Sequence, residues 1–267
     1  MDFTAAKNAA SYSSRSADSS WADQITGTLD PRGLDVVDIG CGGGIYSRAW
    51  RELGAASVTG VDSSRPILAQ AAADHEKDSQ LTFRSGEALA TGLETASADV
   101  VFARALVHHL DDLRGFVGEA VRLLRPGGRL LIQDRTLDDV AQPADAGHVR
   151  GFFFAAFPHL LEVEARRRPA AQIMTEALEG SGCVVDVASF WEVRAHHPDR
   201  ASLLADVAAR TGRSILHELD DAQLASLVAT MEDLLPAGEI VETDRWTLWS
   251  ARPTSRSETI DTVTAGS

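Results

Sequence analysis

Two periods of apolar residues alternate along the first half of the chain. Short apolar runs predict buried strands, and the stretches between them, where apolar residues recur every three or four positions, predict amphipathic helices. This strand–helix alternation indicates an α/β fold with a mostly parallel sheet and helices on both faces. The predicted strands are Asp35–Ile39, Ser57–Val61, Leu81–Arg84, Asp99–Ala103 and Arg129–Gln133, and the predicted helices are Ile45–Leu53, Pro66–Ala73 and Leu113–Leu124.

After Asp134 the pattern changes to longer helical and aromatic segments. The turn Arg125–Gly128, with proline and two glycines, is expected to end the last helix of the first half. Beyond it the sequence predicts, in order, an aromatic block at Phe152–Pro158, a charged helix, a helix at Ala170–Gly180, a strand at Val184–Val193, a wholly helical segment at 199–235 and a long final strand at Glu239–Ala251.

Composition excludes several classes of protein. The 267 residues are 44% hydrophobic and carry a formal net charge of -14, which disfavours a nucleic-acid partner. The basic run Arg166–Arg168 is expected to be a solvated helix end. No run of about 18 apolar residues predicts a membrane span, the N-terminus lacks the pattern of a signal peptide, and Cys41 and Cys183 suit packed thiols. We therefore expect a cytoplasmic protein without a membrane partner.

The candidate chemistry begins at a glycine-rich loop directly after the first predicted strand. Gly40, Gly42 and Gly44 leave room for a ligand against bare backbone, and the following helix directs amides toward it. A dinucleotide fingerprint needs a small residue where Ile45 stands. Asp38 would repel a pyrophosphate but suits the ammonium and sulfonium charges of S-adenosylmethionine, so the sequence favours that cofactor, with S-adenosylhomocysteine as its product.

Five motifs together carry a resemblance to a known family. They are Asp38–Gly44, Val58–Ser63, Arg84–Ala88, Phe102–Arg104 and Leu124–Leu130, and they fall in the expected order over about residues 34–134. This pattern resembles the class I S-adenosylmethionine-dependent methyltransferases, of the small-molecule type found in ubiquinone and menaquinone biosynthesis. The resemblance implies a seven-stranded Rossmann-like sheet with helical lid insertions.

The resemblance also implies domain boundaries and a cofactor site. We expect an N-terminal arm or helix at 1–30, a methyltransferase domain at 31–252 and a disordered tail at 253–267. Within the domain, 31–136 would form the cofactor-binding core, and 137–168 and 196–236 the helical insertions on the substrate side. The expected cofactor-binding residues are Asp38, Gly40, Cys41, Gly42, Gly44, Asp62, Ser63, Gly86, Glu87, Ala103, Arg104 and Tyr12. Asp62 would bind the ribose hydroxyls and Glu87 the adenine, and Tyr12 belongs either to a segment over the cofactor or to a disordered arm.

The methyl acceptor is expected to be a small molecule, apolar or aromatic, methylated at O, N or C by in-line displacement. Phe153, Phe154 and Phe157 would line its pocket, or would anchor the helical lid on the core. His109 and His108 follow the fourth predicted strand and are candidates for a general base.

Other interpretations of the chain stay open. His148, His159, His196 and His197 lack metal-site spacing, so we expect surface histidines and no metal. The long helical insertions suit a lid or a homodimer interface equally. A non-methylating S-adenosylmethionine-binding protein, or another transferase or cyclase on the same fold, is the alternative function.

Overall fold

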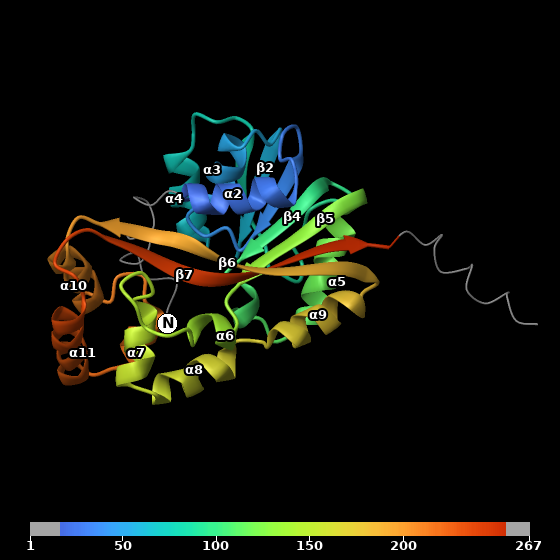
Figure 1. Ribbon diagram of the computed structural model, residues 1–267. Coiled ribbons are helices and arrows are strands. Elements are labelled where there is room, and N and C mark those ends of the chain that lie inside the picture. The colour runs from blue at the N-terminus through green and yellow to red at the C-terminus, as the bar shows by residue number, and fades with distance from the viewer. Residues whose placement is uncertain (1–16, 255–267) are drawn as a thin grey trace, which may run out of the picture.

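One sheet of seven strands organises the molecule, in the order β3-β2-β1-β4-β5-β7-β6 (Figure 1). The computed structural model describes residues 17–254. Strands β1 to β5 run parallel, and β7 is antiparallel to both β5 and β6. The expected seven-stranded, mostly parallel sheet is confirmed. The strands are β1 Asp35–Ile39, β2 Ser57–Asp62, β3 Leu81–Ser85, β4 Ala98–Arg104, β5 Leu124–Asp134, β6 Cys183–His197 and β7 Ile240–Pro253.

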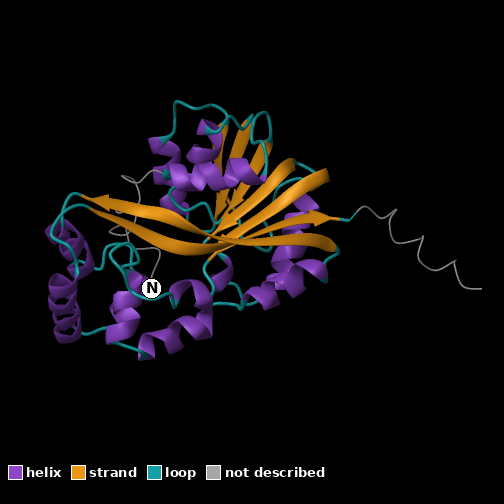
Figure 2. Cartoon of the chain, viewed as in Figure 1, coloured by secondary structure: helices purple, strands orange, loops and turns teal. Residues whose placement is uncertain are grey.

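Helices cover both faces of this sheet (Figure 2). In the first half they are α2 Ser19–Thr28, α3 Ile45–Glu52, α4 Arg65–Asp74, η1 Val107–His109 and α5 Leu113–Leu123. In the second half they are α6 Leu137–Val140, α7 Arg150–Ala156, α8 His159–Arg167, α9 Ala171–Glu179, α10 Arg200–Ala208, η2 Ser214–Glu218 and α11 Asp221–Leu234. Figure 1 shows α2 and α3 on one face, and α5 and α9 on the other.

Alternating side chains of the central strands pack into two hydrophobic cores, one on each face of the sheet. Val36 packs with Trp21 and Trp50 on the α2–α3 face, whereas Val37 packs with Phe116 on the α5–α9 face. Successive side chains of a strand point to opposite faces, so a strand buried on both sides reads as a continuous apolar run. This is why the sequence pattern located the central strands closely.

Strands β6 and β7 extend past the rest of the sheet as a two-stranded ribbon. The last residue of β5, Asp134, pairs with Thr247, so the part of β7 before Thr247 lies beyond the carboxyl end of β5. Helices α6 to α8, α10 and α11 gather beside this ribbon (Figure 1). They enclose a third core, whose fully buried members include Leu160, Leu203 and Leu227.

Apart from shifts of one or two residues at element ends, the structure differs from the predicted elements in three places. Strand β5 begins at Leu124 rather than at Arg129, and the register with β4 shifts between Ala98 and Val100, where the proline–glycine turn is absorbed into the strand. The segment 199–235 is not wholly helical, because Arg210 and Gly212 adopt positive φ between α10 and η2. Strand β6 continues four residues past the predicted Val193 to His197.

Some expectations from the sequence are not tested by the fold. Most of the expected arm, with Tyr12, and residues 255–267 of the expected tail lie outside the described residues. The division at residue 136 and the assignment of the insertions to the substrate side stay predictions. Within residues 17–254, no helix combines the length and the apolar character that a bilayer span requires.

Candidate active site

The glycine-rich loop connects β1 to α3 through three residues in the left-handed region. Gly40, Gly42 and Gly44 have φ values of 75°, 51° and 78°, a conformation that disfavours any side chain. The amide of Gly40 donates to the carbonyl of Val61 at 2.7 Å, which ties the loop to β2. A Cβ on Gly44 would lie 2.6 Å from the ring of Phe83, whereas one on Gly42 would meet no described atom within 4 Å. Gly42 therefore borders open space, and its contact with a ligand stays a prediction.

Asp38 lies at the base of this loop and is 2% exposed. The hydroxyl of Ser47 donates to its Oδ2 at 2.5 Å. Burial, opposed by this hydrogen bond and reinforced by the nearby charge of Asp62, raises the pKa of Asp38 to about 7. A buried carboxyl poised in this way would ionise readily beside an ammonium group.

Asp62 ends β2 and braces the glycine loop from the neighbouring strand. Its Oδ2 accepts from the amide of Gly42 at 3.0 Å, and its Oδ1 accepts from the amide of Ser64 at 2.9 Å. Each carboxylate oxygen can accept a further hydrogen bond, as two ribose hydroxyls would require. The amide of Cys41 donates to the carbonyl of Val61, and the adjacent Ser63 is exposed. The structure thus brings Asp62 and the loop together, while the ligand contacts of Ser63 and Cys41 stay predictions.

The loop after β3 also reaches this edge of the sheet. The amide of Gly86 donates to the carbonyl of Asp62 at 3.1 Å. A Cβ on Gly86 would lie 2.6 Å from the carbonyl oxygen of Thr91, so the position has no room for a side chain. Glu87 is exposed, and its contact with an adenine stays a prediction.

Arg104, the last residue of β4, is held by partners from three other elements. Its Nη2 donates to Glu192 Oε1 of β6 at 2.7 Å. Its guanidinium lies over the rings of Tyr46 and Trp246, at 4.1 and 3.9 Å from their centroids. Ala103, the preceding residue, is 1% exposed within the core on the α5–α9 face. The expected contacts of both residues with a cofactor stay predictions.

Glu192 collects hydrogen bonds from the sheet and from the start of α3. Besides the bond from Arg104, it accepts from the hydroxyl of Tyr46 at 2.9 Å and from the side-chain amide of Gln133 at 2.5 Å. Gln133 in turn accepts from the indole of Trp21 at 3.1 Å. This chain of polar contacts fixes Arg104 beside the first turn of α3.

The two candidate histidines occupy different environments. His108 Nδ1 lies 2.8 Å from Asp134 Oδ2, at the end of β5, and the His108 side chain is 9% exposed. Burial opposes ionisation of Asp134, but His108 and Arg168 lower its pKa to about 2. The ring of His109 is tilted against that of His108, with centroids 4.0 Å apart. Burial, together with the neighbouring His108, lowers the pKa of His109 to about 4. Their catalytic roles stay predictions.

The aromatic block lies in the helical layer beside the ribbon. Phe153 and Phe154, on α7, are 1% and 5% exposed in the third core, and Phe157 packs against that core at the end of the same helix. This packing is what the anchoring interpretation expects. A role of the three phenylalanines in lining an acceptor pocket stays a prediction.

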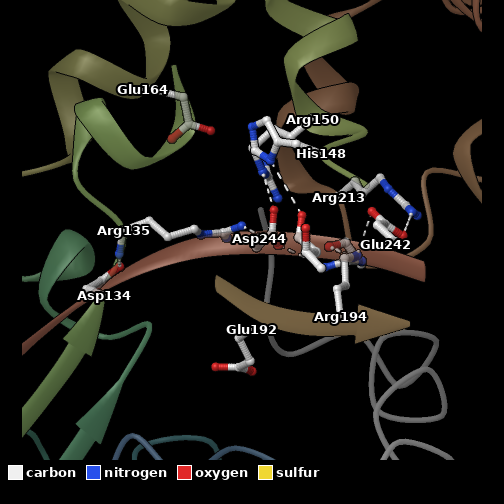
Figure 3. Close-up of polar contacts among 12 residues, drawn as sticks. Asp134, Arg135, His148, Arg150, Glu164, Glu192, Arg194, Arg213, Glu242 and Asp244 are labelled. Atoms are coloured by element: carbon white, nitrogen blue, oxygen red, sulfur yellow. Dashed lines mark hydrogen bonds and ion pairs between the residues drawn. The ribbon is translucent and has the colours of Figure 1, made fainter. Parts of the chain in front are cut away.

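A group of buried charges on the ribbon was missed by the sequence analysis. Figure 3 shows Arg135, Arg150 and Arg194 pointing toward Asp244 from the end of β5, from α7 and from β6. We name this group the ribbon cluster, and its members are Arg135, Arg150, Arg194, Arg213, Glu242 and Asp244. The sequence did contain a signal for this cluster. On β7, Glu242 and Asp244 stand at every second position between the buried Ile240 and Trp246, which places both acids on the same buried face.

Three sequence interpretations around this cluster are wrong. Arg168 is not a solvated residue at a helix end, because its side chain is 3% exposed and pairs with Glu164 and Asp134. His148 and His197 are not surface histidines, since they are 1% and 5% exposed. His197 Nε2 lies 3.0 Å from Glu242. Within residues 17–254, no group of three or more His, Cys, Asp or Glu is arranged to hold a metal ion.

The part of the chain that contains the glycine-rich loop resembles known methyltransferases in sequence. Residues 37–132 match the family model described as "Methyltransferase domain". The chain is 37% identical over 114 residues to the ubiquinone biosynthesis O-methyltransferase of Xanthomonas oryzae, covering 41% of this chain and 46% of that protein. It is 33% identical over 156 residues to the 27-O-demethylrifamycin SV methyltransferase of Amycolatopsis mediterranei, covering 55% and 57%. The chain thus spans about half the length of the curated relatives it matches.

A solved structure extends the likeness of the fold over most of the chain. The crystal structure described as a methyltransferase from an antibiotic biosynthesis pathway of Anabaena variabilis has a TM-score of 0.67 and 20% identity, covering 88% of this chain and 98% of that one. The family match begins at Val37 within β1 and includes the glycine-rich loop and Asp62. Residues 37–132 therefore match a methyltransferase domain, and the chain shares the fold of this solved methyltransferase.

Proposed function

We propose that the protein transfers a methyl group from S-adenosylmethionine to a small-molecule acceptor bound at the carboxyl edge of the sheet. The observation that carries the proposal is the joined arrangement of Asp38, the glycine loop and Asp62. The open space beside Gly42 and the buried carboxyl of Asp38 fit a ligand that has an ammonium group. In this fold, ligands bind at the carboxyl ends of the strands, where these residues lie.

The residues of the chain would bind and orient the reactants. S-adenosylmethionine, when bound, supplies an electrophilic methyl on a sulfonium, which is a good leaving group. Asp62 would accept from the ribose hydroxyls, and Asp38 would pair with the ammonium group. Alignment of the acceptor atom with the methyl and the sulfur then supplies much of the rate.

A proton must leave an acceptor hydroxyl or amine, and His108 is the better placed of the two histidines. Asp134 contacts its Nδ1 at 2.8 Å, so the carboxylate would hold the tautomer that leaves Nε2 free to accept a proton. His109 would then contribute mainly to the shape of the site. A His108→Gln variant that retains wild-type turnover, with an unchanged pH–rate profile, would refute this assignment.

The central test is binding of S-adenosylhomocysteine by isothermal titration. Asp62→Ala should weaken binding by about tenfold or more, because hydrogen bonds between a carboxylate and the ribose are lost. Asp186→Ala is the matched control, since Asp186 lies on β6 with 74% of its side chain exposed and should leave binding unchanged. Undiminished affinity in Asp62→Ala would reject the proposed site.

The acceptor and the cellular setting belong to the same proposal. The net charge of -14 supports a small molecule over a nucleic acid, and the rings of Tyr46 and Trp246 beside Arg104 are consistent with an aromatic acceptor. A homodimer and a cytoplasmic location remain predictions. Methyl transfer to a member of a metabolite panel would separate this proposal from a non-methylating or cyclase function.

A further inference from the structure

The ribbon cluster holds more guanidinium groups than carboxylates. Asp244 Oδ2 accepts from Arg135 at 2.9 Å and lies 3.8 Å from Arg194, while its Oδ1 accepts from Arg150 at 3.1 Å. Glu242 lies 3.2 Å from Arg194 and 2.7 Å from Arg213. Four arginines therefore share two carboxylates. All six side chains are at most 14% exposed.

The neighbouring carboxylates offset this surplus of positive charge only in part, since Glu164, whose charge favours ionised Arg150, is shared with other arginines. Glu164 is bonded to Arg167 and Arg168, and Asp134 is bonded to Arg168 and His108. Glu192 is matched by Arg104. An uncompensated buried charge is costly, so a network that only braced the fold would be expected to balance its charges.

Two polar atoms at this site lack a hydrogen-bond partner. Arg135 Nε and His148 Nε2 are buried, and neither bonds to any residue within 17–254. His148 is 1% exposed, and its Nδ1 faces the carbonyl of Thr243 at 3.4 Å. Buried polar groups are normally paired, and an unpaired donor often marks the place of a ligand or a water. Burial, together with the nearby charge of Arg150, lowers the pKa of Arg135 to about 9, as expected where positive charge is crowded.

The cluster adjoins the proposed methyl-transfer site through one indole ring. The guanidinium of Arg104 lies 3.9 Å from the Trp246 centroid, and that of Arg135 lies 4.6 Å from it. Arg104 ends β4, and Arg135 follows the last residue of β5. Both arginines therefore stand at the carboxyl edge of the sheet, where an acceptor would lie beside the methyl donor.

We infer that the ribbon cluster binds an oxyanion group, a carboxylate or a phosphate ester, of the methyl acceptor, with Arg135 and Arg150 as its principal ligands. This inference rests on the proposed function. The planar guanidinium fork matches the two oxygens of a carboxylate or phosphate, and a bound anion would reduce the surplus of positive charge. The acceptor is accordingly an acidic small molecule, and an aromatic acid satisfies both the cluster and the nearby rings.

The test uses the whole protein saturated with S-adenosylhomocysteine and titrated with three probes of similar shape. Benzoate and phenyl phosphate carry the two candidate oxyanions, and benzamide is the neutral counterpart. We expect saturable binding of at least one anion and at least tenfold weaker binding of benzamide, because charge-assisted hydrogen bonds are lost. The stronger of the two anions identifies the chemical class of the acceptor group.

Variants then locate the binding to the cluster. Arg135→Gln should weaken anion binding by about tenfold or more. Arg135→Lys keeps the charge but loses the planar guanidinium, so its anion affinity should lie between those of Arg135→Gln and the wild type. Arg125→Gln is the matched control. Arg125 pairs with Asp35 and Asp99 at the opposite end of the sheet, so its loss should leave anion binding unchanged.

The outcomes separate this inference from the function on which it rests. Failure of the wild type to bind S-adenosylhomocysteine would reject the proposed function itself. Binding of S-adenosylhomocysteine without preference for either anion over benzamide would overturn only the oxyanion site. Equal anion affinity in the wild type and in a folded Arg135→Gln variant would overturn it too, and would leave Arg135 as a structural partner of Asp244. If Arg135→Gln does not fold, Arg135→Lys and the comparison of the three probes decide.

Discussion

The half of the molecule around β1 to β5 and the half around the β6–β7 ribbon are held together by different means. In the first half, apolar side chains fill a core on each face of the sheet, with Val36 and Phe102 in one core and Val37 in the other. The ribbon half has its own apolar core, but its junction with the sheet is a layer of buried arginines and carboxylates. Apolar packing tolerates changes of pH and salt, whereas buried ion pairs depend on every partner being present and ionised.

The largest expected effect comes from removing the shared carboxylate of the ribbon half. Asp244→Ala leaves Arg135, Arg150 and Arg194 with less compensation, and should lower the free energy of unfolding by about 3–5 kcal/mol. Leu131→Ala, in the apolar half, should cost a comparable amount, about 2–5 kcal/mol. Urea unfolding measures both changes without adding ions.

Sulfate then distinguishes the two variants. An anion can partly replace the lost carboxylate, so sulfate should restore more stability to Asp244→Ala than to Leu131→Ala. Equal responses of the two variants to sulfate would remove the distinction between the two halves, as would a cost below about 1 kcal/mol for Asp244→Ala.

Acid provides a smaller and more selective perturbation. The folded-state pKa of Asp134 is about 2, below its ordinary value of 3.8. Ionised Asp134 therefore contributes about 2 kcal/mol to the free energy of unfolding above about pH 4. This contribution is lost as the pH falls toward 2. We expect Asp134→Asn to be destabilised at pH 7 and to lose less stability than the wild type on acidification. Parallel stability profiles of the two proteins between pH 5 and about pH 3 would contradict this pKa.

The smallest expected effect lies in the apolar half, at Asp38 near the end of β1. The pKa of Asp38 is raised to about 7, so its charged form is disfavoured in the free protein. If Asp38 pairs with an ammonium group, affinity for S-adenosylhomocysteine should rise about tenfold per pH unit up to pH 7 and then level off. Titrations between pH 5.5 and about pH 8.5 measure this dependence.

The effect of a substitution at Asp38 on thermal stability also tests the raised pKa of this residue. A carboxyl group whose pKa is raised on folding stabilises the folded state at low pH, and this stabilisation is lost as the pH rises through about 7. Asp38→Asn should therefore melt higher than the wild type at pH 8, but not at pH 4, while binding S-adenosylhomocysteine more weakly. A pH-independent affinity in the wild type would argue against ionisation of Asp38 on binding.

What the sequence predicted follows the same division of the molecule. The strands around Val37 and Val101 and the glycine loop were located closely, because apolar periods and glycine positions are local signals. Asp62 was placed at the loop because it ends the next strand. The ribbon cluster was missed, since Arg135 and Asp244 are 109 residues apart and no local pattern reports their contact. For the same reason Arg168, whose partner Asp134 is 34 residues away, was mistaken for a solvated residue.

The projection of the ribbon past β5 has a consequence for how such a protein can diversify. The insertion 137–168 follows β5, and the insertion 196–236 connects β6 to β7, so neither adjoins in sequence the strands β1 to β3, which lead to the glycine loop and Asp62. If the insertions bind the acceptor, as the sequence predicts, changes in them would alter which acceptor is admitted without moving the residues that would hold the donor. The family match ends at residue 132, two residues before the ribbon passes the end of β5. If the proposed function holds, the half that would bind the donor and the half that would bind the acceptor meet at the end of β5.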